Sequence, residues 1–169
     1  MSLLSPRNPV PVLAMAMAAV LTACSGPGSS ASAPVAAVSP VASGNACDRN
    51  LITKADVAGL FSEPIATVEP LKGDPQSCVF TTTHFSSVTV SVRPGVGDST
   101  VDAWLTGRMN VTAVPAGGVG EKAAWTPILR ELNASHRNLL CDIGAAGPAS
   151  AGATQARVAA LCNKIFAAT

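Results

Sequence analysis

Five cysteines are the residues of this chain best suited to chemistry. Cys24 ends an apolar stretch near the N-terminus, whereas Cys47, Cys78, Cys141 and Cys162 are spread over the rest of the chain. An even number of thiols in this longer part predicts disulfides formed in an oxidising compartment. Four cysteines permit three pairings. We favour Cys47 with Cys78 and Cys141 with Cys162, because each bond would join a cysteine in or beside a helix to a strand of the same half.

Metal and redox chemistry fit these four cysteines less well than disulfides do. Structural zinc sites use closely spaced pairs such as C-x-x-C, and catalytic dithiols use the same motif. The gaps between successive cysteines here are far longer than two residues. We therefore predict no metal ion and no cofactor.

The first residues resemble a bacterial export signal that ends in a lipidation site. Arg7 is followed by an uncharged apolar run over residues 10–23. This run of roughly 14 residues is shorter than the roughly 20 that a membrane-spanning helix needs, so it predicts a signal peptide over residues 1–23. Leu21-Thr22-Ala23-Cys24 resembles the lipobox, in which the cysteine is acylated and becomes the new N-terminus.

The lipobox resemblance implies where the protein resides. Each buried methylene of an acyl chain contributes about 0.8 kcal/mol, so several chains on Cys24, such as palmitate, would anchor the protein stably in a cell membrane. The protein would then lie in the cell envelope, outside the cytoplasm. Ser25 stands where aspartate favours the inner membrane. The resemblance thus implies the periplasmic side of the outer membrane in a Gram-negative cell, and otherwise the outer face of the plasma membrane.

Composition divides the remaining chain into a tether and one domain. Residues 24–46 begin with the lipidated cysteine and are otherwise mostly Ser, Gly, Pro, Ala and Val without charge, which predicts a flexible linker with an end-to-end distance of about 25 Å. Residues 47–169 are long enough for a single domain. Only 12% of the chain is charged and its net charge is +1, so no basic surface for nucleic acid is expected.

Capping signals and hydrophobic periodicity predict three helices. Thr53 and Asp56 form a capping-box spacing before an apolar face at Val57, Leu60 and Phe61, and Pro64 ends that helix. A second helix is expected from Asp98 or Ser99, with Ser99 and Asp102 in the same spacing and a buried face of Val101, Trp104 and Leu105. Val158, Leu161, Cys162 and Ile165 give the apolar stripe of a C-terminal helix.

Alternating patterns predict the strands. We expect strands over residues 77–83 and 86–93, the second with Val88, Val90 and Val92 buried and Ser87, Thr89 and Ser91 on a wet face. A short strand over 111–114 and a glycine-rich loop over 115–120 come next. A hairpin is expected from strands 123–132 and 137–143, turning at 133–136, with Pro127 at an edge or bulge. Residues 144–152 read as a loop. The sum is an α+β fold, an antiparallel sheet with about three helices packed on it and two disulfides.

Other candidate sites are weaker. His84 and His136 fall at predicted turns, which favours exposed turn residues over a catalytic base. The sequence contains no G-x-S-x-G motif that would indicate a nucleophilic serine. The stretch from Gly117 to Lys122 lacks the Gly-Lys-Ser/Thr ending of a phosphate-binding loop. Scattered carboxylates such as Asp98 do not identify a glycosidase pair. Trp104 and Trp125 are more typical of core than of a sugar-stacking platform. We therefore assign no catalytic residue.

The order of motifs is similar to that of small bacterial cell-envelope lipoproteins that carry a domain of unknown function. The resemblance covers 47–60, 78–81 and 118–125, the last reading Gly-Val-Gly-Glu-Lys-Ala-Ala-Trp. It implies architecture and location, and it assigns no activity. The sequence thus favours a non-catalytic binding or interaction module, held to the membrane by lipid, for another envelope protein, a glycan or a small hydrophobic ligand. An envelope hydrolase with a His-based site, or an inhibitor or structural accessory protein, is the alternative.

Overall fold

The computed structural model describes residues 46–107, 110–115 and 117–169. The predicted signal peptide, Cys24 and the predicted tether up to residue 45 lie outside these ranges. Ala46, the last residue of the predicted tether, is 1% exposed in the core, so the packed part of the chain begins at least one residue before the predicted boundary. Among the helices of the described ranges, none is long and apolar enough to cross a bilayer.

A seven-stranded, wholly antiparallel sheet forms the centre of the fold and confirms the predicted α+β class. The strands lie in the order β1-β2-β3-β7-β6-β5-β4. Their bounds are β1 Ile65–Leu71, β2 Asp74–Thr82, β3 Ser87–Pro94, β4 Thr112–Ala113, β5 Lys122–Thr126, β6 Glu131–His136 and β7 Leu139–Ala146. Two meanders therefore meet in the middle of the sheet, where β3 pairs with β7.

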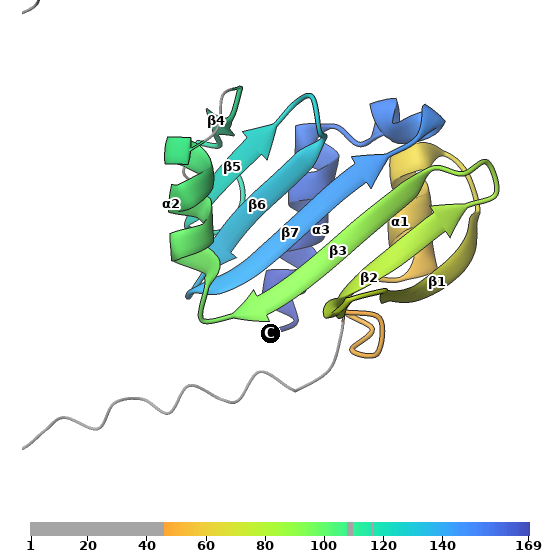
Figure 1. The fold of residues 1–169 in the computed structure, drawn as a ribbon, viewed down its shortest axis with the longest axis horizontal. Coiled ribbons are helices and arrows are strands. Elements are labelled where there is room, and N and C mark those ends of the chain that lie inside the picture. The colour runs from red at the N-terminus through yellow and green to blue at the C-terminus, as the bar shows by residue number, and fades with distance from the viewer. Residues whose placement is uncertain (1–45, 108–109, 116) are drawn as a thin grey trace, which may run out of the picture. The chain divides into compact units, whose positions relative to one another are not determined.

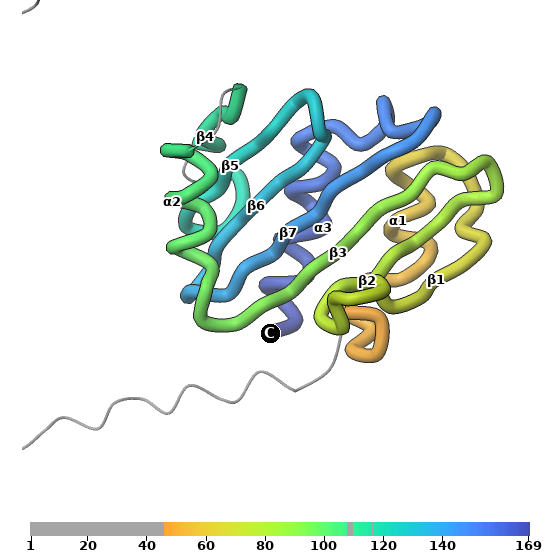
Figure 2. Tube along the Cα trace, in the orientation of Figure 1, coloured from red at the N-terminus to blue at the C-terminus, as the bar shows by residue number. Residues whose placement is uncertain are grey.

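The helices lie on both faces of this sheet. Their bounds are α1 Lys54–Phe61, α2 Gly97–Gly107 and α3 Gln155–Ala167, and a 3₁₀ turn, η1, spans Pro148–Gly152. Figure 1 shows α1 and α3 behind the sheet and α2 in front of it. In Figure 2 the chain leaves β3, runs through α2 and reaches β4 at the far edge, from which the second meander returns to the centre.

The main hydrophobic core lies between the sheet and the α1 and α3 helices, and we call this side of the sheet the core face. Val88, Val90 and Val92 of β3 are buried there, as the alternation predicted. The apolar stripes of α1 and α3 are buried against the same core, which also confirms their prediction. Val101, Ala124 and Leu140 are buried outside this cluster, because α2 packs on the opposite side, which we call the α2 face.

The start of α1 shows why this sequence folds into a helix there. The Thr53 side chain accepts a hydrogen bond from the Asp56 amide, and the Asp56 carboxylate accepts one from the Thr53 amide. This reciprocal capping box satisfies amides that the first helical turn leaves without partners. Lys164 of α3 donates to the same Asp56 carboxylate at 2.6 Å, so the cap also ties the two helices together.

Several predicted boundaries were wrong, for identifiable reasons. The hairpin turns at residues 127–130 and not at 133–136. Its first strand, β5, lies between β6 and β4 in the sheet and not at an edge. The polar Asn133, Ser135 and His136, which we interpreted as turn residues, lie in β6, where tertiary pairing overrides local preference. The second helix begins at Gly97, and the Ser99 hydroxyl donates to the Val96 carbonyl oxygen instead of capping the helix. Of the predicted buried face, Leu105 is 37% exposed.

The edge strand β1 was missed altogether. Its sequence carries Pro70, and proline within a strand removes a backbone donor from the hydrogen-bond ladder. β1 has only one neighbouring strand, β2, so an edge position tolerates that loss. A local pattern containing proline gives no indication of such a strand, because the edge position is decided by the whole sheet.

Candidate functional site

A row of polar side chains crosses the α2 face of four neighbouring strands. The register places Ser77 of β2 opposite Ser91 of β3, Ser91 opposite Asp142 of β7, and Asp142 opposite Asn133 of β6. Directly opposed residues project from the same face of a sheet, so these four side chains form one continuous line, which we call the polar row. Ser77, Ser91 and Asn133 are each 3% exposed or less. Ser91 is therefore buried, although the sequence pattern predicted it on the solvent-exposed face of the sheet.

One end of the polar row is satisfied by hydrogen bonds and an ion pair. The Ser77 and Ser91 hydroxyls bond to each other, and the Ser77 hydroxyl also donates to Asp74 at 2.7 Å. Arg93 pairs with the same Asp74 carboxylate. The hydrogen bond from Ser77, together with those from the Gln76 amide and Arg93, outweighs burial and lowers the pKa of Asp74. This end of the row therefore holds a stable negative charge next to a positive one.

The other end of the polar row is centred on Asp142, whose carboxylate lacks hydrogen-bond donors among the described residues. Among the described residues, no group donates a hydrogen bond to this carboxylate. Burial raises the pKa of Asp142, the nearby Glu131 carboxylate also raises it, Arg93 lowers it and Asp74 raises it, with a net result of about 7. Desolvation disfavours a charge that has no compensating partner. Asp142 is thus a carboxyl group that changes charge near neutral pH, which is a common property of functional groups.

Asp142 faces a hollow of about 320 Å³ on the α2 face, which we call the α2-face hollow. Two hydroxyls, two carboxyls and a group of small or apolar residues line it: Ser87, Thr89, Leu129, Glu131, Asp142, Gly144, Ala145 and Ala146. Asn133 donates to the Glu131 carboxylate at 3.2 Å and so holds it in place. The hollow therefore presents hydrogen-bond acceptors on its floor and an apolar wall.

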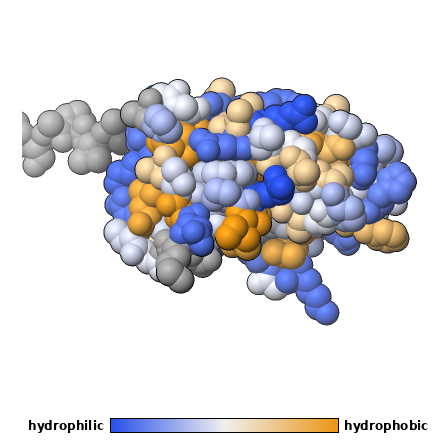
Figure 3. All heavy atoms as spheres, turned by 90° about the horizontal axis from the view of Figure 1, so that it is seen from above, coloured by the Kyte–Doolittle hydropathy of each residue, from blue (hydrophilic) through white to orange (hydrophobic). Residues whose placement is uncertain are grey.

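Exposed apolar side chains stand beside this hollow. Leu129, which lines it, is 49% exposed, and its neighbour Ile128 in the β5–β6 turn is 75% exposed. Figure 3 looks down on the end of the sheet that carries this turn, and it shows apolar atoms in separate patches between hydrophilic ones. A ligand in the hollow would thus meet polar groups on one side and apolar surface on another.

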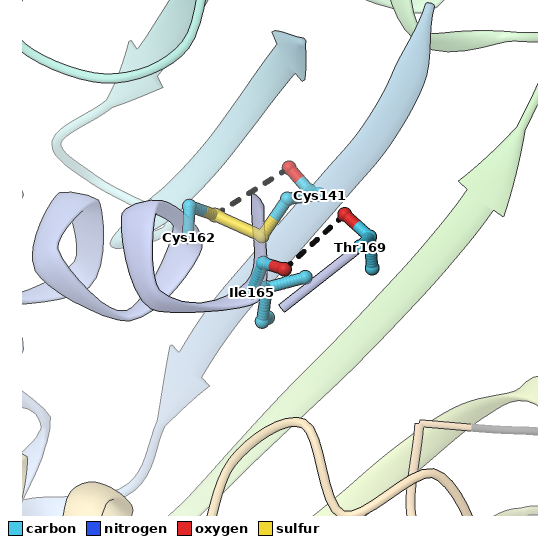
Figure 4. Close-up of a disulfide and its surroundings, with 4 residues drawn as sticks. All are labelled: Cys141, Cys162, Ile165 and Thr169. Carbon is cyan, nitrogen blue, oxygen red and sulfur yellow. Dashed lines mark hydrogen bonds between the residues drawn. A yellow bond between two sulfur atoms is a disulfide. The ribbon is translucent and has the colours of Figure 1, made fainter. Parts of the chain in front are cut away.

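The four cysteines of the folded part form the two predicted disulfides. Cys47 pairs with Cys78 and Cys141 with Cys162, with Cα–Cα distances of 5.2 and 5.8 Å. Figure 4 shows the second bond joining α3 to β7, with the Cys162 sulfur 3.8 Å from the Cys141 carbonyl oxygen and Ile165 and Thr169 nearby. All four are thus structural crosslinks on the core face.

The two histidines do not share a site. His84 lies in the β2–β3 turn, 3.8 Å from Glu63, and His136 ends β6, 3.7 Å from Glu121 and against the Phe166 ring. The antiparallel order puts these positions at opposite ends of the sheet. Neither residue lines the α2-face hollow. The structure therefore brings neither histidine to the polar row.

The tryptophans and the helix-start carboxylates also remain separate. Trp125 is 7% exposed in the main core, whereas Trp104 is on α2, across the sheet. Asp98 accepts a hydrogen bond from Ser135 at 2.6 Å, and Asp102 pairs with Lys122 at 3.0 Å. Trp125 is thus core, as predicted, and the two tryptophans form no joint platform.

A larger hollow of about 440 Å³ lies between α3 and the segment before β5. Small apolar residues of α3 line much of it, and Asn163 donates across its edge to the Gly118 carbonyl oxygen at 3.2 Å. No titratable group lines this hollow. In the ranges that the structure describes, no three His, Cys, Asp or Glu side chains are placed to hold a metal ion. The α2-face hollow is therefore the stronger candidate site.

Sequence reasoning missed this site. Asp142 is the one charged residue in an otherwise apolar strand, Leu-Leu-Cys-Asp-Ile-Gly-Ala-Ala, and that contrast was the available signal. Its partners come from strands far apart in the sequence, and one of them, Asn133, we had placed in a turn. Comparisons with protein-family models, curated proteins and solved structures found no match.

Proposed function

We propose that this protein is a lipid-anchored binding module of the bacterial cell envelope, exposed outside the cytoplasm, with the α2-face hollow as its ligand site. The anchor is inferred from Leu21-Thr22-Ala23-Cys24 and the apolar run before it. Two disulfides in the folded part support an oxidising compartment.

The hollow carries the binding part of the proposal. It combines an unsatisfied carboxyl group, hydroxyl acceptors and an apolar wall within about 320 Å³, and small-molecule sites characteristically combine apolar walls with a few placed polar groups. The Asp142 carboxylate receives no hydrogen bond from the described residues, so a bound ligand would supply the hydrogen bonds that this carboxylate lacks.

The test fills the hollow without straining the backbone. A Cβ on Gly144 would meet Glu131 Cγ at 3.7 Å, which is ordinary contact, so Gly144→Leu adds a side chain that occupies the hollow. Gly59→Leu is the matched control, because nothing lies within 4 Å of a Cβ at that exposed position.

The measurement is native mass spectrometry of the full chain isolated from its own membranes. We expect wild type and Gly59→Leu to carry a non-covalent ligand mass that Gly144→Leu lacks, and all three to carry acyl mass on Cys24. A Gly144→Leu protein that retains the ligand mass would contradict the binding site. An unacylated Cys24 would contradict the anchor.

A further inference from the structure

We infer that the folded domain makes a second contact with its own bilayer, through two turns at one end of the sheet. These are the β2–β3 turn, residues 83–86, and the β5–β6 turn, residues 127–130, and we call them together the apolar tips. The inference goes beyond the α2-face hollow. It rests on the anchor part of the proposed function, because lipid on Cys24 is what keeps the domain beside a membrane.

Each turn carries a large apolar side chain that projects into solvent. Phe85 is 86% exposed and Ile128 is 75% exposed, with the half-exposed Leu129 next to Ile128. The antiparallel register brings both turns to the same end of the sheet, to which the arrowheads of β2, β5 and β7 point in Figure 1. The turns are three strand spacings apart, or about 14 Å. Both can therefore touch one flat surface at the same time.

The backbone conformation of Phe85 is costly, and hydrogen bonds around it hold the turn in place. Its φ of 65° lies in the left-handed region, which a bulky side chain rarely adopts. The Ser86 amide donates to the Thr82 hydroxyl at 3.0 Å, and the Ser86 hydroxyl accepts a hydrogen bond from the Ala149 amide at 2.9 Å. Such strain is typical of positions with a functional role. The turn thus presents the Phe85 ring as a preorganised apolar anchor.

The charged residues of the apolar tips suit lipid headgroups. Neither turn contains an acidic residue, whereas one contains Arg130 and the other His84, whose side chain is 74% exposed. Glu63 lies 3.8 Å from His84, and Glu131, which follows Arg130, lines the α2-face hollow. The long apolar stem of an arginine can lie along lipid while its guanidinium stays at the level of the phosphates. Apolar side chains flanked by basic ones are characteristic of interfacial membrane contacts.

The arrangement of the apolar tips favours a bilayer over a protein partner. A specific protein interface has a closely packed centre from which water is excluded. Figure 3 instead shows apolar atoms in separate patches, with hydrophilic atoms between them. A fluid bilayer has no fixed shape to match, so separate tips can each enter its headgroup region.

The predicted tether is long enough for the domain to lie with its apolar tips on the membrane. The described chain begins beside β2, where Cys47 is bonded to Cys78, and Figure 2 shows this first segment in orange near the start of that strand. The tips lie at the other end of β2, about 30 Å away. Residues 24–46 span at most about 80 Å when extended. Tethering also raises the effective concentration of lipid, so a weak contact is sufficient.

The experiment measures which amides of the anchored protein approach lipid. The full acylated chain is placed in nanodiscs of phosphatidylcholine and phosphatidylglycerol, and NMR spectra are compared with and without nitroxide-labelled lipid. We expect the amide signals of Phe85 and Ile128 to lose most of their intensity. Lys72 and Asn138 lie in turns at the opposite end of the sheet, so their signals should be retained in the same spectrum.

Two variants test the individual anchors. Phe85→Ser and Ile128→Ser should each weaken docking about tenfold, as read from the intensity of the Leu129 amide, because each removes one large apolar side chain from lipid. Leu105→Ser is the matched control, since it removes a partly exposed leucine of α2 that lies outside the apolar tips. The control should dock as wild type does.

The outcomes separate this inference from the proposed function. Intensity loss at Lys72 and Asn138, or at neither end, would overturn the bilayer contact, and so would unchanged docking of both serine variants. Shifts of Phe85 and Ile128 that grow with protein concentration, without nitroxide lipid, would assign the tips to a second copy instead. An acylated chain without lipid contact at the tips would overturn this inference alone. An unacylated Cys24 would overturn the anchor and this inference together.

Discussion

Replacing Asp142 with asparagine is expected to stabilise the folded protein above neutral pH. The amide keeps the shape of the side chain and removes a charge that burial disfavours and that Glu131 repels. Because the folded-state pKa is raised, the wild-type carboxyl contributes fully to stability below its ordinary pKa of 3.8, and that contribution is lost as the pH rises to about 7.

The magnitude can be worked out from the shift. Moving the pKa from 3.8 to about 7 corresponds to about 4 kcal/mol, at about 1.4 kcal/mol per unit. The free energy of unfolding of Asp142→Asn should therefore exceed that of wild type by less than about 1 kcal/mol at pH 4 and by about 4 kcal/mol at pH 8.

Urea unfolding followed by tryptophan fluorescence, with the disulfides intact, measures this difference at pH 4, 6 and 8. Asp74 and Asp56 titrate in both proteins and cancel in the difference. Burial opposes ionisation of Asp56, but hydrogen bonds from Lys164 and Thr53 prevail, so its pKa is lowered, as is that of Asp74. Their contributions are lost only as the pH falls below 3.8.

The exposed Asp102→Asn serves as the control and should show little change at any of these pH values. The reasoning would be refuted if Asp142→Asn were less stable than wild type at pH 8. It would equally be refuted if the difference between the two proteins were the same at pH 4 and pH 8.

Two further changes test the crosslinks and one close backbone contact. Replacing both Cys141 and Cys162 with alanine should lower the free energy of unfolding by about 3 kcal/mol, because the loop that the bond closes regains its freedom in the unfolded chain; a loss below about 1 kcal/mol in urea unfolding would contradict this. Gly147→Ala should destabilise more than Gly73→Ala. Both glycines have positive φ, but only at Gly147 would a Cβ lie 2.6 Å from a backbone atom, Ser86 Cα, while at Gly73 nothing lies within 4 Å. Equal thermal shifts for the two variants would show that backbone conformation alone, and not this contact, makes glycine necessary.

Local patterns in the sequence were enough for the helices, the central valine strand and the crosslinks. The capping box at Thr53 and Asp56 depends on residues three apart, and the stripe from Val158 to Ile165 depends on helical spacing alone. The disulfide pairing could be inferred once the helices and strands that carry the cysteines were placed. The lipidation motif at Cys24 is also a property of sequence alone, and it stays a prediction.

Tertiary structure decided the strand pairings and, with them, the candidate site. Asp142 gains its neighbours Ser91 and Asn133 only because β7 inserts between β3 and β6, and its raised pKa results from the burial that this arrangement creates. Tertiary structure likewise decided that Pro70 lies in an edge strand and that Asn133 lies in a strand. Spacing along the chain carries periodicity and caps, whereas register across a sheet and desolvation depend on segments that meet only in the folded state.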